Sequence, residues 1–357
     1  MPISDSLNPS RPLRCGVIGV GRMGRHHARK YAELPGVTLV GVVDQDEERR
    51  LAVAEKHGCA GFATQAELMR AGVDAVSIAV PTVDHLACAE PLLSAGVACL
   101  IEKPLANDVT EARRLMLAAE KSGAVLMVGH IERFNPAVRA LQKAQQDMKS
   151  SGQPGIVPRF IEVHRVSPMT FRSVDVSVVM DMMIHDLDVV LMLMNGREPE
   201  RVDAAGVSVL TEHEDVCNAR LVFQMPQGKC VANITASRLA LKTERKIRII
   251  GENAYVSIDY AKKGGVLIRR TTNALPIEEI REALRTGADL SDLDYGKLLA
   301  IEELAVDDAD QLEMELAEFL DAVRTGRKPA IDAEAGFMNV RTAHRIMEEC
   351  RANSWKG

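Results

Sequence analysis

An aspartate and a histidine four residues apart, Asp181 and His185, have the types and spacing that proton transfer requires. They begin a predicted helix, Asp181–Met194, in which residues four apart share one face. Asp188 extends that face, whereas Asp186 points elsewhere. An imidazole, with an ordinary pKa of about 6.5, can take a proton from an alcohol near neutral pH. The alternative is structural, with an aspartate N-cap and an interior histidine.

A lysine with related chemistry, Lys103, follows the predicted strand Ala98–Glu102 in the motif Ile101-Glu102-Lys103-Pro104. Carboxyl ends of parallel strands face the ligand crevice of an α/β sheet. An ammonium group there can donate a hydrogen bond to a substrate hydroxyl. Taken alone, it is equally a surface lysine beside a turn proline.

A glycine-rich turn, Gly19-Val20-Gly21-Arg22-Met23-Gly24, follows a predicted strand and opens a predicted helix. The first glycine permits a tight turn, the second allows close approach of a pyrophosphate, and the third lets helix and strand pack. The helix N-terminus presents unpaired N–H groups to the phosphates. This context predicts a dinucleotide site rather than a turn that merely favours glycine.

Asp44 lies twenty residues after Gly24, at the end of the second predicted strand. A carboxylate at this position accepts hydrogen bonds from the adenosine ribose and repels a 2′-phosphate, which favours NAD over NADP. The alternative is that Asp44 caps the helix that follows, and both roles can hold together.

The elements that position these residues change character at Ile131. Up to that point short apolar runs alternate with helices, which predicts a doubly wound parallel sheet of the Rossmann type in residues 1–131. Residues 132–357 are expected to form a substrate-binding and oligomerisation domain of the α+β class with a mainly antiparallel sheet. Its predicted strands are 159–166, 202–211, 217–225, 229–237, 246–250 and 255–259, and its predicted helices are 136–148, 181–194, 276–285, 311–324 and 333–351.

The bulk composition excludes several classes of protein. A net charge of -6 and scattered basic residues give no electrostatic reason to bind nucleic acid or an anionic membrane. Seven cysteines without a CxxC motif favour free thiols over disulfides or a zinc site, so no metal is expected. The polar N-terminus and the lack of a long apolar run predict a cytoplasmic protein without a membrane span.

These signatures occur in an order that resembles the Gfo/Idh/MocA oxidoreductase family over nearly the whole chain: GxGxxG with Asp44, then Glu-Lys-Pro, then Asp-x-x-x-His. The resemblance implies that His185 is the base, that Lys103 bonds to the reacting hydroxyl or relays its proton, and that Asp181 holds the sugar. It also implies a cis Lys103–Pro104 peptide. The presence of Lys103, Asp181 and His185 argues against a sensor that binds dinucleotide without turnover.

The segments 129–137 (GHIERFNPA) and 179–188 (VMDMMIHDLD) resemble the branch of that family that acts at C3 of UDP-N-acetylhexosamines. This implies a 3-keto UDP-sugar product, which a pyridoxal-phosphate aminotransferase would convert to an amino sugar. The implied sugar or diphosphate contacts are Arg133, Asn135, Arg172 and Asp175, and the implied contacts near the nicotinamide are Pro81, Thr82, His85, Glu102 and Lys103. Structural alternatives stay open, with Arg133 as an interdomain salt bridge and His85 as a helix N-terminal residue.

Two other substrates use the same Lys–Asp–His group. A free polyol such as inositol or glucose carries no diphosphate and would not need Arg133. UDP-N-acetylglucosaminuronate would need a further cationic partner for its carboxylate. A face of the second sheet that is free of helices also predicts a homodimer or homotetramer.

Overall fold

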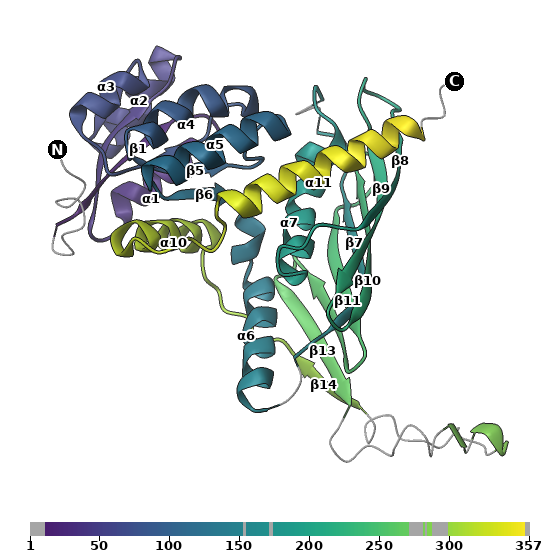
Figure 1. Cartoon of the computed structure of the whole chain (residues 1–357). Helices are drawn as coiled ribbons and strands as arrows, with labels where there is room; N and C mark the ends of the chain where they lie inside the picture. Colours follow the sequence, from purple (N-terminus) through teal and green to yellow (C-terminus); the bar gives the residue numbers. More distant parts are fainter. Residues whose placement is uncertain are drawn as a thin grey trace. The chain divides into compact units, whose positions relative to one another are not determined.

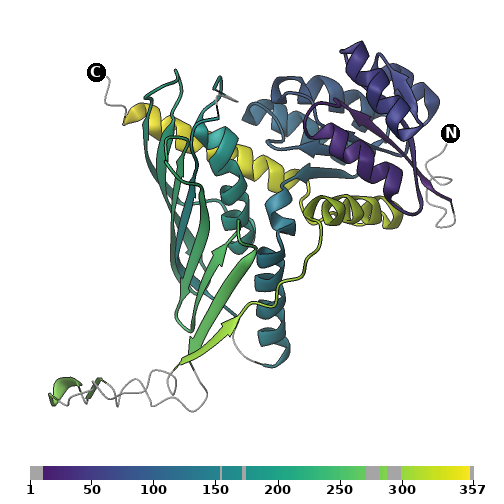
Figure 2. The ribbon, with the colours of Figure 1, turned by 180° about the vertical axis from the view of Figure 1, so that it is seen from behind.

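The computed structural model describes residues 11–152, 155–170, 174–270, 281–282, 284–287 and 299–353. These residues form two compact units (Figures 1 and 2). Unit 1 takes its residues from 1–134, 179–198 and 309–357, and unit 2 from 135–178 and 199–308. The division differs from two consecutive domains, because the segment with Asp181 and His185 and the C-terminal helices return to unit 1.

A six-stranded parallel sheet forms the centre of unit 1, in the order β3-β2-β1-β4-β5-β6. This confirms the predicted doubly wound sheet. The strands are β1 Leu13–Ile18, β2 Val37–Val43, β3 Ala60–Phe62, β4 Ala75–Ile78, β5 Ala98–Glu102 and β6 Leu126–Gly129. The strand β3 was not predicted, because its three residues carry no apolar periodicity. The seven-residue helix after it, α3 (Gln65–Ala71), was also missed, although Thr64 and Glu67 form a capping box at its start.

Helices pack on both faces of this sheet. They are α1 Gly24–Glu33, α2 Glu47–His57, α4 His85–Ser94, α5 Val109–Ser122, α10 Gln311–Thr325 and α11 Ala333–Ala352, with 3₁₀ turns at Thr82–Asp84 and Ile131–Phe134. Local signals set the ends of these helices. Asp108 caps α5 by accepting from the N–H of Glu111, and Gly123 ends it in the left-handed conformation.

Helix α10 joins unit 1 from far along the chain and lies beside α1 (Figure 1). Lys30 of α1 forms ion pairs with Asp310 at 2.9 Å and Glu313 at 2.8 Å. On its buried face, Leu316 and Phe319 are fully enclosed in the core that surrounds the sheet. The C-terminal segment therefore completes the hydrophobic core of unit 1.

The segment Val179–Leu193 also belongs to unit 1, and its first turn departs from the predicted α-helix. Residues Val179–Met183 form a π-helical turn, and α7 follows as Ile184–Leu193. Asn339 of α11 donates from Nδ2 to the carbonyl of Ile184 at 3.1 Å, which fixes the junction. π-Helical turns are rare and frequently mark functional sites.

Unit 2 contains an eight-stranded sheet in the order β14-β13-β12-β11-β7-β10-β9-β8. All neighbours are antiparallel except the parallel pair β7 and β10, which confirms the predicted mainly antiparallel domain. The strands are β7 Pro158–Val166, β8 Arg201–Val207, β9 Val216–Met225, β10 Gly228–Ser237, β11 Glu244–Gly251, β12 Ala254–Asp259, β13 Gly264–Arg270 and β14 Leu299–Glu303.

Helix α6 (Pro136–Ser150) packs against β12 and β13 in this unit. The strands β13 and β14 were not predicted. The predicted helix 276–285 falls largely outside the described residues. Within the described part of the chain, no helix is both long and apolar enough to cross a membrane.

Candidate active site

The turn between β1 and α1 requires two of its three glycines for steric reasons. Gly19 has a φ of +81°, and a Cβ on Gly24 would lie 1.8 Å from the carbonyl oxygen of Gly19. At Gly21, by contrast, a Cβ would meet no described atom within 4 Å. The second glycine therefore faces open space, which is the position where a pyrophosphate must approach the backbone.

A cavity of about 910 Å³ adjoins this turn. It extends along the carboxyl ends of the strands, from Asp44 after β2, past Gly21, to Pro81 after β4 and Lys103 after β5. The order of the sheet reverses direction at β1, and ligands bind to α/β sheets at such a point. Arg22, Met23 and Glu102 also line the cavity, whereas Thr82 and His85 are not among its lining residues.

Asp44 is held by backbone and side-chain donors at one end of the cavity. Its carboxylate accepts from the N–H of Val20 at 2.9 Å and from the N–H of Asp46 at 3.0 Å. Arg49 Nη1 lies 3.3 Å from both carboxylate oxygens. Asp46, rather than Asp44, caps helix α2. Arg49 lines the same cavity and was missed by the sequence analysis, which considered only the carboxylate.

The Glu-Lys-Pro turn and the Asp-x-x-x-His segment meet within unit 1. Lys103 precedes a cis peptide bond to Pro104, as the resemblance implied. Its Nζ donates to the main-chain carbonyl of Asp181 at 2.8 Å and lies 4.0 Å from the carboxylate Oδ1. The side chains are 20% and 30% exposed, so both are held in place yet accessible to a ligand.

The histidine of that segment, His185, lies in the first turn of α7 and is half-buried. The next acidic residues of the segment, Asp186 and Asp188, are buried. The turn after β5 thus carries an ammonium group, the π-helical turn carries a carboxylate, and α7 carries an imidazole. Such a set can bind a hydroxyl group and take its proton.

Arg133 has a structural role in this region. Its guanidinium forms a bidentate ion pair with Asp188, from Nε to Oδ2 and from Nη2 to Oδ1, both at 2.7 Å. Nη1 donates to the carbonyl of Ala330 at 3.1 Å. The structure therefore shows Arg133 in a salt bridge, as in the structural alternative. Both partners belong to unit 1, so the salt bridge is not an interdomain one. A substrate contact would have to use the two N–H groups that these bonds leave.

His85 is buried and spans two loops beside the cavity. Its Nδ1 lies 3.0 Å from the carbonyl oxygen of Pro104, and its Nε2 lies 3.1 Å from that of Val80. Burial lowers the pKa of His85, although the neighbouring carbonyl oxygens act in the opposite direction. The arrangement ties the turn after β4 to the turn that carries Lys103, and His85 therefore positions the cavity wall.

The remaining predicted substrate contacts belong to unit 2 or lie outside the described residues. Asn135 is buried and caps α6 by accepting from the N–H of Ala137 at 3.1 Å. Asp175 is exposed in a turn, and Arg172 is not among the described residues. Their contact with a substrate stays a prediction.

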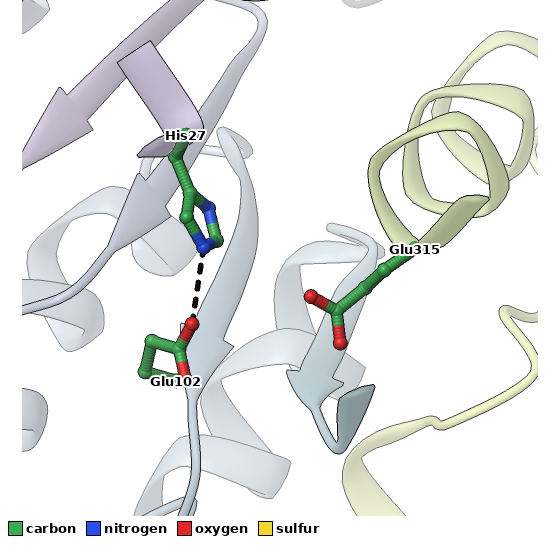
Figure 3. A group of neighbouring side chains, drawn as sticks. All are labelled: His27, Glu102 and Glu315. Atoms are coloured by element: carbon green, nitrogen blue, oxygen red, sulfur yellow. Dashed lines mark hydrogen bonds and ion pairs between the residues drawn. The ribbon is translucent and has the colours of Figure 1, made fainter. Parts of the chain in front are cut away.

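Two buried titratable residues were missed altogether. His27 of α1 and Glu315 of α10 lie next to Glu102, as Figure 3 shows. A signal for Glu315 was present in the sequence, since it falls between Leu312, Leu316 and Phe319 on the apolar face of an amphipathic helix. A charged residue at such a position is rarely buried without a specific reason.

Comparison with known families adds two matches. The sequence model of a family described as an oxidoreductase family with an NAD-binding Rossmann fold matches residues 13–130. The GFO/IDH/MocA C-terminal domain matches residues 165–257.

Comparison with individual proteins agrees. The UDP-N-acetylglucosamine 3-dehydrogenase of Acidithiobacillus ferrooxidans is 36% identical over 326 residues, which cover 91% of this chain and 93% of that protein. A solved structure of that enzyme has a TM-score of 0.80, with 35% identity, and covers 95% of this chain and 98% of its own. The myo-inositol 2-dehydrogenase of Thermotoga maritima is 27% identical over 95% of this chain and 98% of its own. The WlbA dehydrogenase of Bordetella pertussis, solved with NADH and UDP-GlcNAcA, is 20% identical with a TM-score of 0.75 over 97% of both chains and shares the fold.

Proposed function

This chain belongs to the Gfo/Idh/MocA family of NAD-dependent oxidoreductases, and we propose that it oxidises the C3 hydroxyl of a UDP-N-acetylhexosamine to a 3-keto sugar. UDP-N-acetylglucosamine is the proposed substrate. The observation that carries the proposal is the contact of Lys103 with Asp181, one turn before His185, at the wall of the cavity that begins at the glycine turn.

The cavity suits NAD on the evidence of its own residues. The crowding at Gly24 and the open space at Gly21 form a backbone cradle for a pyrophosphate, and Asp44 lies at the end where an adenosine ribose would bind. When bound, NAD supplies the nicotinamide that accepts the hydride from the substrate carbon. Pro81 and Lys103, at the other end of the cavity, would then hold the nicotinamide.

In the proposed mechanism the protein binds the sugar and moves one proton. Lys103 donates a hydrogen bond to the reacting hydroxyl, and Asp181 accepts from a neighbouring hydroxyl. His185 takes the hydroxyl proton as the C–H bond breaks, so the alcohol becomes a ketone and the imidazole becomes an imidazolium. Most of the rate enhancement comes from positioning these groups, since the protein forms no covalent bond with the substrate.

The choice of a UDP-sugar rests on the degree of similarity. The UDP-N-acetylglucosamine 3-dehydrogenase is 36% identical, compared with 27% for the myo-inositol 2-dehydrogenase over a similar length. The second candidate is UDP-N-acetylglucosaminuronate, because the fold is shared with a dehydrogenase solved with UDP-GlcNAcA. A 3-keto sugar is a substrate for a pyridoxal-phosphate aminotransferase, which is the proposed next enzyme. We place the reaction in the cytoplasm, where NAD and nucleotide sugars are made.

We further propose a homodimer or homotetramer formed through unit 2. Alternate residues of β9 are exposed, so the sheet presents a regular polar face, with pairs such as Asn218 with Thr235 and Arg220 with Asn233. Sedimentation equilibrium tests this proposal, and a monomer at micromolar concentration would contradict it.

The substrate is tested with a panel of UDP-sugars, their uronic acids and free polyols, each incubated with NAD while NADH absorbance is recorded. We expect turnover of UDP-N-acetylglucosamine. A second substrate sample deuterated at C3 should transfer deuterium to the cofactor, whereas deuterium at C4 should stay on the sugar. Turnover of inositol without turnover of any UDP-sugar would contradict the proposal.

A further inference from the structure

Three titratable side chains meet at the wall of the cofactor cavity, each from a different element of unit 1 (Figure 3). They are His27 of α1, Glu102 at the end of β5 and Glu315 of α10. One ligand atom from each lies within 4.8 Å of the other two, and His27 Nε2 is 3.0 Å from Glu102 Oε1. His27 and Glu315 are fully buried, and Glu102 is the member that lines the cavity.

Glu315 is the unusual member of this cluster. Neither of its carboxylate oxygens has a hydrogen-bond partner among the described residues, and Figure 3 shows the carboxyl group directed toward Glu102 and His27. An ionised carboxylate is strongly disfavoured when it is buried without a partner. A second negative charge at Glu102 adds repulsion. A single proton on Glu315 removes both costs.

The carboxylate of Glu102, unlike that of Glu315, has neighbours that stabilise its negative charge. His27 Nε2 donates to its carboxylate, and the ammonium of the next residue, Lys103, is close in the chain. Burial raises the pKa of Glu102, but the hydrogen bond and the charge of His27 outweigh it, so this pKa lies below its ordinary value. Burial raises the pKa of Glu315 well above its ordinary value, and the charge of Glu102 raises it further. The two carboxyl groups are thereby driven to different protonation states.

We propose that Glu315 is a neutral carboxylic acid at neutral pH and that, with His27, it is a positioning residue that holds Glu102 as the one negative charge of this three-residue cluster, at the wall of the cofactor cavity. This matters for the cofactor because NAD carries an anionic diphosphate and many hydroxyl groups. One fixed carboxylate accepts hydrogen bonds from those hydroxyls, whereas two adjacent carboxylates would repel the diphosphate. The inference concerns the cofactor cavity and is independent of which sugar is oxidised.

A divalent cation shared by the three side chains would also balance the charge, and the donor set of one imidazole and two carboxylates can hold such an ion. The two explanations differ in what glutamine does at position 315. Glutamine has the shape of a neutral glutamic acid, so it replaces a protonated Glu315 well. As a metal ligand it is poor, so it would abolish a cation site.

The test measures NAD affinity of the full-length protein by titration calorimetry without any sugar, so it is independent of the proposed reaction. The variants are Glu315→Gln, Glu315→Ala and Glu102→Gln. The matched control is Glu313→Gln, two residues along the same helix, where the glutamate is 52% exposed and paired with Lys30.

We expect Glu315→Gln and Glu313→Gln to bind NAD within about twofold of the wild type, and Glu102→Gln to bind roughly tenfold more weakly. Glu315→Ala should also weaken binding, because it removes the group that packs against Glu102. The infrared spectrum of the wild type should contain a protonated carboxyl band that is missing in Glu315→Gln and present in the control.

Three results would overturn the inference. One is a loss of NAD affinity of tenfold or more in Glu315→Gln while that variant melts at the wild-type temperature. Another is the absence of the protonated carboxyl band in the wild type. Binding of one Zn²⁺ or Mn²⁺ per chain that Glu315→Gln abolishes would likewise show a charged Glu315 and reject the neutral acid.

Discussion

Lys103 is bonded to the main chain of Asp181 and not to its side chain, since Lys103 Nζ donates to the carbonyl oxygen at 2.8 Å and lies 4.0 Å from the carboxylate Oδ1. The position of the ammonium therefore depends on the π-helical turn more than on the side chain of Asp181. Substitutions at position 103 and at position 181 should therefore have different effects. Every variant at position 181 keeps the main-chain carbonyl that accepts the hydrogen bond from Lys103.

We predict that Lys103→Met lowers kcat by two to four orders of magnitude, roughly the contribution of a positioned proton donor or relay. NAD affinity should be unchanged within a few fold, as measured by calorimetry. Asp181→Asn should lower kcat/KM by only about tenfold, because Lys103 keeps its carbonyl partner. Lys121→Met, at the exposed end of α5, is the control. An equal loss in both active-site variants would show that the carboxylate itself holds Lys103.

His185→Asn should lower kcat by roughly two to four orders of magnitude, because asparagine cannot accept the hydroxyl proton. The NAD affinity and the melting temperature should stay at their wild-type values. His57→Asn, on α2, is the matched control and should be fully active. The measurement is single-turnover NADH formation, which isolates chemistry from product release. Full activity of His185→Asn would remove it from the proposed mechanism.

The cofactor preference should depend on Asp44 and Arg49 together. Asp44→Ala removes the charge that repels a 2′-phosphate and releases the guanidinium of Arg49, so the ratio of kcat/KM for NADP to that for NAD should rise by about tenfold or more. NAD affinity itself should fall, because Asp44 also anchors the N–H of Val20.

The double variant Asp44→Ala/Arg49→Ala should lose the gain for NADP. Arg50→Ala is the control, since Arg50 donates to the main-chain carbonyl of Asp44 and not to its carboxylate. If the double variant kept the gain, Arg49 would have no part in recognising the phosphate.

Most of the fold was predictable because its signals are local. The helix Val109–Ser122 begins after a capping aspartate and ends before a glycine, and both are boundary signals that the sequence itself carries. The strands β3, β13 and β14 were missed because they are short or lack alternation. The π-helical turn was missed because nothing in the residues Val179–Met183 distinguishes it from an α-helical turn.

The motif residues of the candidate site were singled out from the sequence because each lies at a strand end or a helix start. The pairing of the charged side chains around them could not be predicted in this way. The bonding of Arg133 to Asp188, 55 residues away, depends on the tertiary fold, and so does the burial of Glu315 beside Glu102. Periodicity indicates which residues are buried, whereas it says nothing of which buried charges meet.

In unit 2, acid should unfold a loop that depends on one buried carboxylate. Asp215 Oδ2 accepts from the N–H groups of Val209, Leu210 and Thr211. Burial raises the pKa of Asp215, but these hydrogen bonds outweigh it, so the pKa lies below its ordinary value of 3.8. A lowered pKa means that the stabilisation is present above the unfolded value and is lost as the pH falls through the folded value.

Asp215→Asn should therefore lower the free energy of unfolding by about 1–3 kcal/mol at pH 7. The difference from the wild type should be constant down to about pH 5 and shrink below about pH 4. Urea unfolding at each pH measures it, and Asp203→Asn, at an exposed position of β8, is the control. A difference that grew on acidification would contradict the assignment.

The pair of Arg133 and Asp188 should contribute to stability rather than to substrate affinity. Asp188 is fully buried, and the guanidinium satisfies both of its oxygens at 2.7 Å. Arg133→Met leaves that carboxylate buried without its partner, so unfolding should become easier by roughly 3–5 kcal/mol. Arg133→Met/Asp188→Leu removes both charges and should recover most of the loss. The free energies come from urea unfolding, and the KM for UDP-N-acetylglucosamine is measured on the folded double variant. If that KM rose more than tenfold while stability was restored, Arg133 would be a ligand of the diphosphate, as the sequence first implied.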